Sequence, residues 1–387
     1  MNRRRAASAA VLLALLMPLP LAAAGTSAAA DAPSAAESRR TTLELPRPTG
    51  RFSVGQETLH LVDRSRTDPW SQSGPRELMV TMRYPAQRGT GGPVRYLTRE
   101  EARLLLVDRE LDKAIPVETL AGTAAHSRSH ARPVAGRYPL IVLSPGFTVP
   151  RATLTALAED LASRGYVVAA VDHAYESAGT AFPGGRVLEC LACEKVEAAG
   201  GMRAVSDTRA RDVSFLLDRL TGRDPAWRHA GLIDASRIAM AGHSIGGASA
   251  AAAMATDPRV RAGVNMDGGF ATPVPETGLG GRPFMLLGTQ NRGPGGNQNW
   301  DLQWPKLDGW KRWITFADSG HFTFSDFPVF GDQLGLPDPQ APLSGARSVE
   351  LTRRYVGAFF DQHLRGVPQP VLDGPSANAP EVRVHTP

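Results

Sequence analysis

Residues 237–249 read Arg-Ile-Ala-Met-Ala-Gly-His-Ser-Ile-Gly-Gly-Ala-Ser, and this stretch decides the fold. The apolar run 237–241 is typical of a buried strand, and the alanine-rich residues after Gly246 are typical of a helix. Between them stands a Gly-x-Ser-x-Gly turn with Ser244 at its apex. A turn of this kind pushes a serine hydroxyl out at the edge of a sheet, where a histidine can reach it. A bare match can arise by chance, so the rest of the chain must supply the strands, a base and an acid.

Short apolar runs alternate with helical patterns along the remaining chain. Periodic apolar positions predict helices around 154–161, 213–220 and 351–359, and a further helix over 98–113. The predicted strands comprise two opening strands, more typical of antiparallel pairing, and six buried strands: 51–63, 77–84, 138–143, 165–171, 237–241, 260–266, 283–287 and 313–316. This alternation indicates a mostly parallel central sheet with helices on both faces. Together with the Gly-x-Ser-x-Gly turn and the length of the chain, it leads us to expect an α/β-hydrolase fold.

The two ends of the chain are expected to lie outside that domain. Three arginines precede an apolar run over 11–21 and then small residues, which predicts a secretory signal peptide over 1–30. The run is too short and too rich in alanine for a stable membrane anchor. We expect a flexible segment over 31–48, a catalytic domain over 49–366 and an irregular, Pro-rich tail over 367–387. The sequence therefore predicts a secreted protein.

Charge and cysteine content narrow the classes of partner and cofactor. Residues 1–30 hold three arginines and no acidic residue, so the formal charge of +5 falls to +2 for the remainder. No long basic run is present, which argues against a nucleic-acid partner. Cys190 and Cys193 are the only cysteines and lack a nearby histidine, so a zinc site is not expected. Their spacing favours a disulfide in an oxidising compartment, with a redox pair or two free thiols as alternatives.

His321 is the best-placed base for Ser244. It follows the last predicted strand in a short loop, and this fold uses the chain order serine, acid, histidine. Because a serine hydroxyl is a poor nucleophile near neutral pH, it needs such a base within hydrogen-bond reach. The other histidines are less well placed: His243 as a packing residue, His173 as a residue that could line the pocket, His363 in the last helix and His385 in the tail.

Asp267 is the predicted acid, because it ends the strand over 260–266 at the same sheet edge. Its role would be to orient the imidazole and to stabilise its charged form. Many α/β hydrolases take the acid from the loop one strand later, but here that loop, 288–299, contains no acidic residue. Asp301 is the alternative acid, and Asp318 is interpreted as a turn residue.

Two backbone amides are candidates for stabilising the oxyanion of a tetrahedral intermediate. One is the N–H of Ile245, and the other is the N–H of Phe147 in the turn Ser144-Pro-Gly-Phe147. One such donor contributes about 3 kcal/mol to the transition state. The alternative is that 144–147 is an ordinary turn at the end of a strand.

These motifs together resemble the platelet-activating factor acetylhydrolase family of α/β hydrolases. The resemblance spans about residues 50–365 and rests on the turn 143–147, the segment 160–173, the turn 242–247, Asp267, and His321 with its following loop. It implies calcium-independent serine ester hydrolysis by Ser244, Asp267 and His321. Neither a metal nor an organic cofactor is expected. The chain departs from the family at Pro145 and over 172–204, where substrate loops differ.

Three other functions compete with this interpretation. The turn at 144–148 is also similar to that of bacterial cutinases, although those polyester hydrolases take their acid from the later strand. The tryptophan-rich stretch 300–313 could shape an apolar cleft, but it is better explained by indoles packing on the sheet. A catalytically silent binding protein and an amidase are the remaining alternatives. The expected partner is a small-molecule, lipid or polymer ester, and the sequence carries no signal of an oligomeric state.

Overall fold

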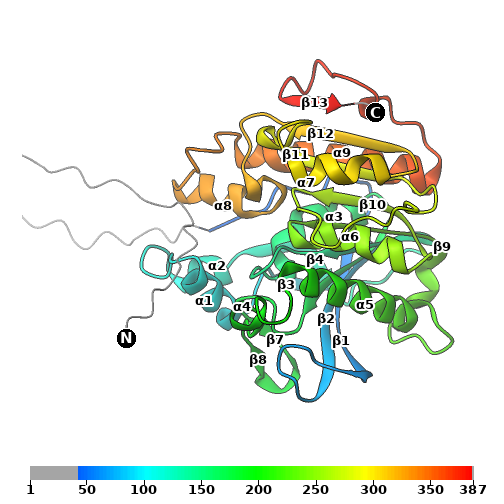
Figure 1. Cartoon of the computed structure of the whole chain (residues 1–387). Coiled ribbons are helices and arrows are strands. Elements are labelled where there is room, and N and C mark those ends of the chain that lie inside the picture. Colours follow the sequence, from blue (N-terminus) through cyan, green and yellow to red (C-terminus); the bar gives the residue numbers. More distant parts are fainter. Residues whose placement is uncertain (1–41, 386–387) are drawn as a thin grey trace, which may run out of the picture. The chain divides into compact units, whose positions relative to one another are not determined.

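An eleven-stranded sheet organises residues 42–385, the part of the chain that the computed structural model describes (Figure 1). Its strand order is β13-β12-β11-β10-β9-β5-β6-β2-β1-β4-β3, and the six strands from β12 to β6 are mutually parallel. The strands are β1 (Ser53–Thr67), β2 (Pro75–Ala86), β3 (Gly92–Arg95), β4 (Ala124–Ser129), β5 (Tyr138–Ser144), β6 (Val167–His173), β9 (Ile233–His243), β10 (Val260–Met266), β11 (Phe284–Thr289), β12 (Lys311–Phe316) and β13 (Val382–His385), with a separate hairpin of β7 (Thr180–Ala181) and β8 (Val187–Leu188).

Helices cover both faces of the sheet because successive residues of each central strand point to opposite sides. In β5, Leu140 and Val142 pack in one core with α5 and α6, while Ile141 and Leu143 pack in a second core with α3 and α9. The helices are α1 (Arg99–Asp108), α2 (Val117–Ala121), α3 (Thr155–Ser163), α4 (Ala192–Lys195), α5 (Met202–Thr221), α6 (Ile245–Thr256), α7 (Gln298–Gln303), α8 (Phe327–Leu334) and α9 (Gly345–Arg365). This is the α/β-hydrolase architecture that the sequence predicts.

The predicted elements of the central domain are present. Each of the eight predicted strands has its counterpart, and β1 and β2 are antiparallel as expected. The helix predicted over 98–113 is α1, which begins at a capping box between Thr98 and Glu101. It ends five residues earlier than predicted, because Glu110 adopts a left-handed φ of 57°.

Both predicted flanking segments require correction within the described residues. The segment expected to be flexible over 31–48 is packed from its described start at residue 42 onward, with Leu43 and Leu45 buried in the core that includes α1. The tail expected to be irregular over 367–387 contains β13, which pairs antiparallel with β12 at the sheet edge. A four-residue strand in a Pro-rich context gives too little alternation to be recognised. The predicted signal peptide over 1–30 lies outside the described residues.

The disulfide between Cys190 and Cys193 is formed, as the sequence favours, and it ties the residue Cys190, which follows β8, to the first turn of α4. Within 42–385, no helix is both long and apolar enough to cross a membrane. The same residues contain no cluster of His, Cys, Asp or Glu side chains arranged to hold a metal ion.

Candidate active site

Ser244 lies at a strained turn between β9 and α6. Its φ of 56° and ψ of −127° are outside the regions that L-residues prefer. The flanking glycines permit the turn: a Cβ at Gly242 would lie 2.2 Å from the carbonyl carbon of Gly246, and one at Gly246 would lie 2.1 Å from the carbonyl oxygen of Ser144. The Gly-x-Ser-x-Gly pattern is therefore required by backbone packing at this point.

His321 and Asp267 meet Ser244 at the carboxyl edge of the parallel strands. The Nε2 atom of His321 lies 3.0 Å from the Ser244 hydroxyl, and its Nδ1 atom lies 2.5 Å from Oδ2 of Asp267. Asp267 follows β10 with a left-handed φ of 59°, and its side chain is 3% exposed, whereas that of His321 is 41% exposed. An ionised carboxylate accepts the Nδ1–H, so Nε2 is free to accept the serine proton.

Two further groups bind the other carboxylate oxygen of Asp267. The backbone N–H of Thr289 donates to Oδ1 over 3.1 Å, and Nε of Arg292 lies 2.8 Å from the same oxygen. Arg292 ends the short helical turn Gln290–Arg292 and stacks on the ring of Trp300. Arg292 is not predicted from the sequence, because only an acidic residue is expected in this loop. The signal that could have identified it is a cationic residue at the end of the neighbouring strand.

His243 is buried beside His321 and supports its loop. Burial and the neighbouring His321 lower the pKa of His243 to about 3, so its ring is neutral. Its Nε2 lies 2.7 Å from the backbone carbonyl oxygen of His321, to which the neutral ring can donate. The sequence predicts a packing residue here, and the structure adds this hydrogen bond to the packing.

The two predicted oxyanion donors belong to the turn after β5 and to the start of α6, and these two segments are in close contact at Ser144 and Gly246. The amide of Ile245 opens α6, and the amide of Phe147 follows β5 in the turn against His243. Within the described chain, neither N–H donates to a protein acceptor, so both can bind a ligand oxygen. The Phe147 side chain packs on an apolar cluster that contains Ile245, with Tyr175 and Leu191 alongside.

The other residues considered from the sequence do not join this site. Asp301 accepts the backbone N–H of Gly295, and Asp318 occupies a turn with a left-handed φ. His173 is buried and bonded to Ser144 and Asp212 instead of lining an open pocket. His363 packs between Trp310 and Phe359. His385, at the end of β13, forms a hydrogen bond with the Thr315 hydroxyl on β12.

The tryptophan-rich stretch packs on the sheet, as the sequence favours. Trp300 and Trp313 are buried and form an edge-to-face pair with ring centroids 5.4 Å apart. Trp300 also donates from Nε1 to the carbonyl oxygen of Gly268 over 2.6 Å. Trp300 thus holds the loop that follows Asp267 in place, and burial leaves neither of these two indoles open to a ligand.

The fold and the Gly-x-Ser-x-Gly turn are those of the α/β-hydrolase class of proteins. A model of the family described as platelet-activating factor acetylhydrolase, isoform II, matches residues 100–185 and 225–360. A probable 1-alkyl-2-acetylglycerophosphocholine esterase from Arthroderma benhamiae is 30% identical, covering 87% of this chain and 92% of that protein. The platelet-activating factor acetylhydrolase of Gallus gallus is 27% identical over 59% of this chain and 62% of its own length.

A solved structure is similar over nearly the whole chain. The ferulic acid esterase from Streptomyces cinnamoneus superposes with a TM-score of 0.80 at 45% identity, covering 89% of this chain and 99% of that one. The chain belongs to the platelet-activating factor acetylhydrolase family, and it is an enzyme that hydrolyses carboxylic esters.

Proposed function

We propose that this protein is a secreted serine ester hydrolase in which Ser244 is the nucleophile, His321 the general base and Asp267 the orienting acid. The observation that carries the proposal is the continuous hydrogen-bonded chain from Ser244 through His321 to Asp267, with contacts of 3.0 and 2.5 Å. The three residues leave three different strands and converge only in the folded chain. An exposed His321 beside a buried Asp267 suits a base that must meet both substrate and water.

The reaction follows from this geometry. The Ser244 hydroxyl attacks the ester carbonyl carbon while His321 takes its proton, and Asp267 stabilises the resulting imidazolium. The carbonyl oxygen becomes an oxyanion that accepts hydrogen bonds from the amides of Phe147 and Ile245. The alcohol then leaves with the proton from His321. Water attacks the acyl-enzyme by the same route and releases the acid, so ester and water balance the cycle without a cofactor.

Changing Ser244 to alanine tests the nucleophile directly. We expect Ser244→Ala to lose hydrolysis of p-nitrophenyl esters by at least about 10³-fold and to lose labelling by a fluorophosphonate probe. Full retention of either property would refute the assignment. A wild-type protein that neither labels nor hydrolyses would instead favour the silent binding protein, because only an activated serine reacts with the probe.

The acid is tested by a matched pair of carboxylates. We expect Asp267→Asn to lower kcat by about 10³- to 10⁴-fold, since the asparagine favours the wrong histidine tautomer. Asp301→Asn, which removes the competing acid, should leave kcat unchanged. The reverse result would move the acid to Asp301.

Two substrate classes have specific support. The curated relatives are named for acetylated ether phospholipids, which suggests short acyl chains. The solved relative is named for ferulic acid, an aromatic acid, and it is the more similar chain at 45% identity. Aromatic side chains of Phe147 and Tyr175 near Ile245 suit a planar acyl group. We therefore propose an ester with a short or aromatic acyl group.

A hydrolysis panel separates these classes. We expect p-nitrophenyl acetate and methyl ferulate to be cleaved and p-nitrophenyl palmitate to be cleaved poorly. Platelet-activating factor in the same panel tests the phospholipid alternative. Polyester erosion would favour the cutinase-like function, and paired anilide substrates test for amidase activity.

Secretion is part of the same proposal. A cleavable signal peptide within residues 1–30 and the disulfide between Cys190 and Cys193 both suit an oxidising compartment. N-terminal sequencing of enzyme from the culture medium should show loss of about the first thirty residues. Recovery only in the cell fraction with Met1 or Asn2 at the N-terminus would contradict secretion.

A further inference from the structure

Directly behind the turn 144–147 lies a closed ring of buried polar side chains, which we call the buried ring. Each member hydrogen-bonds to the next, and the last bonds to the first. All are at most 2% exposed, although five of the six are ionisable. In order the members are Arg76, Glu176, Arg209, Ser144, His173 and Asp212.

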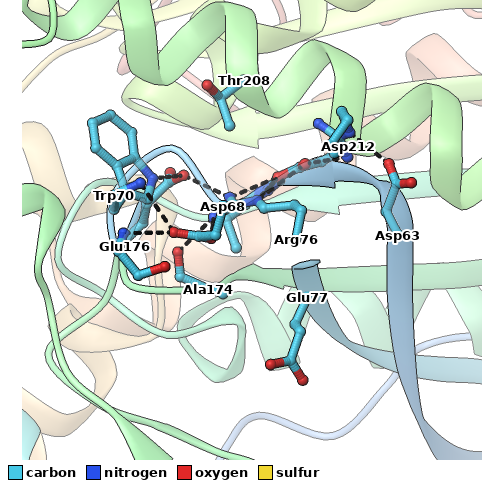
Figure 2. Close-up of polar contacts among 12 residues, drawn as sticks. Asp63, Asp68, Trp70, Arg76, Glu77, Ala174, Glu176, Thr208 and Asp212 are labelled. Atoms are coloured by element: carbon cyan, nitrogen blue, oxygen red, sulfur yellow. Dashed lines mark hydrogen bonds and ion pairs between the residues drawn. The ribbon is translucent and has the colours of Figure 1, made fainter. Parts of the chain in front are cut away.

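One half of the ring is centred on Arg76, and Figure 2 shows the polar contacts of this residue. Its guanidinium donates to Asp212 over 2.8 Å and to Glu176 over 2.8 Å, so it joins the two carboxylates of the ring. It also binds Asp68 and the carbonyl oxygen of Ala174. This half is therefore anchored to β2, where Arg76 lies, and to the loop after β6.

The other half of the ring grips the turn 144–147 through Arg209 on α5. The guanidinium of Arg209 binds Oε2 of Glu176 over 2.7 Å and the Ser144 hydroxyl over 3.2 Å. It also donates to the backbone carbonyl oxygens of Pro145 and, over 3.5 Å, Gly146. Three consecutive residues of the turn are thus held by one buried cation.

Ser144, His173 and Asp212 repeat the connectivity of a catalytic triad. Nδ1 of His173 lies 2.8 Å from Asp212, and Nε2 lies 3.0 Å from the Ser144 hydroxyl. These three side chains are buried, so no ester can reach Ser144. Burial and the nearby Arg209 lower the pKa of His173, which keeps its ring neutral, so Nε2 can accept a hydrogen bond from the Ser144 hydroxyl. These three residues therefore form a fixed chain of hydrogen bonds that has a structural role.

The ion pairs keep the ring charged and its geometry fixed. Burial alone would raise the pKa of Asp212, but Arg76 and His173 outweigh it, and the pKa lies below its ordinary value. Glu176 is held ionised in the same way by Arg209 and Arg76. Buried ion pairs contribute little net stability compared with apolar packing, so their directional bonds are the property that distinguishes them.

Peptide geometry links Arg209 to the candidate oxyanion donor. The carbonyl of Gly146 and the N–H of Phe147 belong to one peptide unit, which is trans, so they point in opposite directions. Because Arg209 binds the carbonyl oxygen, the N–H must point away from the buried ring.

We infer that Arg209 is a positioning residue, which through Ser144 and the backbone carbonyls of 145 and 146 aims the Phe147 amide at the oxyanion. This inference rests on the proposed function, because it assigns a partner to one of its two oxyanion donors. It gives the buried ring a catalytic purpose although none of its members touches the substrate.

Two side-chain changes with a matched control test the inference. Ser144→Ala removes one hydroxyl from the ring, and Arg209→Lys keeps the charge but loses the fork that binds several oxygens. Ser163→Ala, which removes another buried hydroxyl at the far end of α3, is the control. Fluorophosphonate titration gives the concentration of active sites, so that kcat/KM is compared for folded enzyme only.

We expect kcat/KM per titrated site to fall about tenfold for Ser144→Ala and up to about a hundredfold for Arg209→Lys, mainly through kcat. Deleting a whole oxyanion donor costs about a hundred- to a thousandfold, and a misaimed donor should cost less. Inhibition by a trifluoromethyl ketone, whose hemiketal oxyanion occupies the same position, should weaken by the same factor. Ser163→Ala should change neither quantity.

Variants that keep kcat/KM within twofold of wild type would overturn the inference. So would a loss of kcat/KM with unchanged binding of the ketone, since the defect would then lie outside the oxyanion site. If Arg209→Lys fails to fold, Ser144→Ala decides the matter alone. Failure of the proposed function looks different, because either Ser244→Ala would then remain active or the wild-type enzyme would be inactive in the same assay.

Discussion

His243 and Arg292 contact the candidate triad without reaching a substrate, so each can be changed without removing a reacting atom. His243 bonds to the backbone of His321, and Arg292 bonds to the carboxylate of Asp267. A triad is often described by its three members alone, yet a general base works only if its neighbours keep it in place. The two contacts lead to separate predictions.

Replacing His243 should make the position of His321 less fixed without changing the ionisation of the His321 ring. We expect His243→Leu to lower kcat/KM about tenfold and to cost about 1–2 kcal/mol of stability, since the hydrogen bond to the His321 carbonyl is lost. His243→Gln can place an amide N–H near the same carbonyl oxygen, so it should recover much of the lost kcat/KM and much of the lost stability.

The pH dependence separates this role from general-base catalysis. With a pKa of about 3, His243 is neutral across the assay range. The acid limb of the kcat/KM profile should therefore fall at the same pH in wild type and His243→Gln. A shifted limb would show that His243 titrates with the reaction.

Arg292 should matter through the orientation of Asp267. We expect Arg292→Met to lower kcat about tenfold with a smaller change in KM, because Oδ1 of Asp267 keeps only the amide of Thr289. Arg312→Met is a matched control, since Arg312 also stacks on an indole and pairs with an aspartate, Asp373. Equal kinetics for both variants and wild type would contradict the prediction.

The sequence locates the candidate triad better than it locates the residues that contact it. Ser244 can be recognised from its flanking glycines, because close backbone contacts at positions 242 and 246 leave no room for a Cβ atom. Asp267 and His321 follow from strand order. Arg209 and Glu176 do not, because their partners lie on other elements, and a helical arginine without a visible partner is indistinguishable from a solvent-exposed one.

At the scale of elements, Asp326 joins α8 to the start of α3. Its carboxyl group accepts the backbone N–H groups of Thr155 over 3.0 Å and Ala156 over 3.1 Å. Burial raises the pKa of Asp326 to about 7, although these hydrogen bonds act in the opposite direction. The group therefore takes up a proton in the folded state at a pH where the unfolded chain has lost it.

This pKa makes the contribution of Asp326 to stability depend on pH. Because the folded pKa is raised, its stabilisation is complete below the unfolded value near 4 and is lost as pH rises through about 7. We expect Asp326→Asn to be destabilised relative to wild type at pH 5, and the difference to shrink or reverse by pH 8. The change should be at most about 1.4 kcal/mol per pH unit.

Urea unfolding at pH 5, 6, 7 and 8 measures this difference. Asp332→Asn, a change in an exposed aspartate on α8 whose carboxylate accepts the backbone N–H of Gly345, controls for altered charge on the same helix. A constant difference between Asp326→Asn and wild type across the range would show that the carboxyl group does not titrate there.

The limits of sequence reasoning also differ between elements. The central strands are predicted because both of their faces are buried, which produces continuous apolar runs such as that of β6. Strands β3, β4 and β13 lie toward the sheet edges, are short and expose part of their residues, so they carry no such run. Their pairing is decided by the rest of the sheet.

At the scale of the whole molecule, the chain boundary of the folded domain lies earlier than the sequence predicts. Leu43 is 0% and Leu45 3% exposed, and both pack in the core that α1 and α8 share. The buried guanidinium of Arg353 also donates to the backbone carbonyl oxygens of Pro46 and Arg47. Residues 43–47 therefore connect α9 with the core around α1, and they contribute contacts to both.

Truncation should reveal this closure. Burying a leucine side chain contributes about 1.5–3 kcal/mol, so a chain that starts at residue 49 should lose about 3–6 kcal/mol of the 5–15 kcal/mol typical of a domain. We expect its Tm to fall by about 5–15 °C, whereas chains that start at 31 and 42 should melt together. The double change Leu43→Ala and Leu45→Ala in the longer chain should reproduce most of this loss of stability. It should not reproduce all of it, because the contacts of Arg353 with residues 46 and 47 remain. Equal Tm values for the chains starting at 42 and 49 would place the boundary at 49 after all.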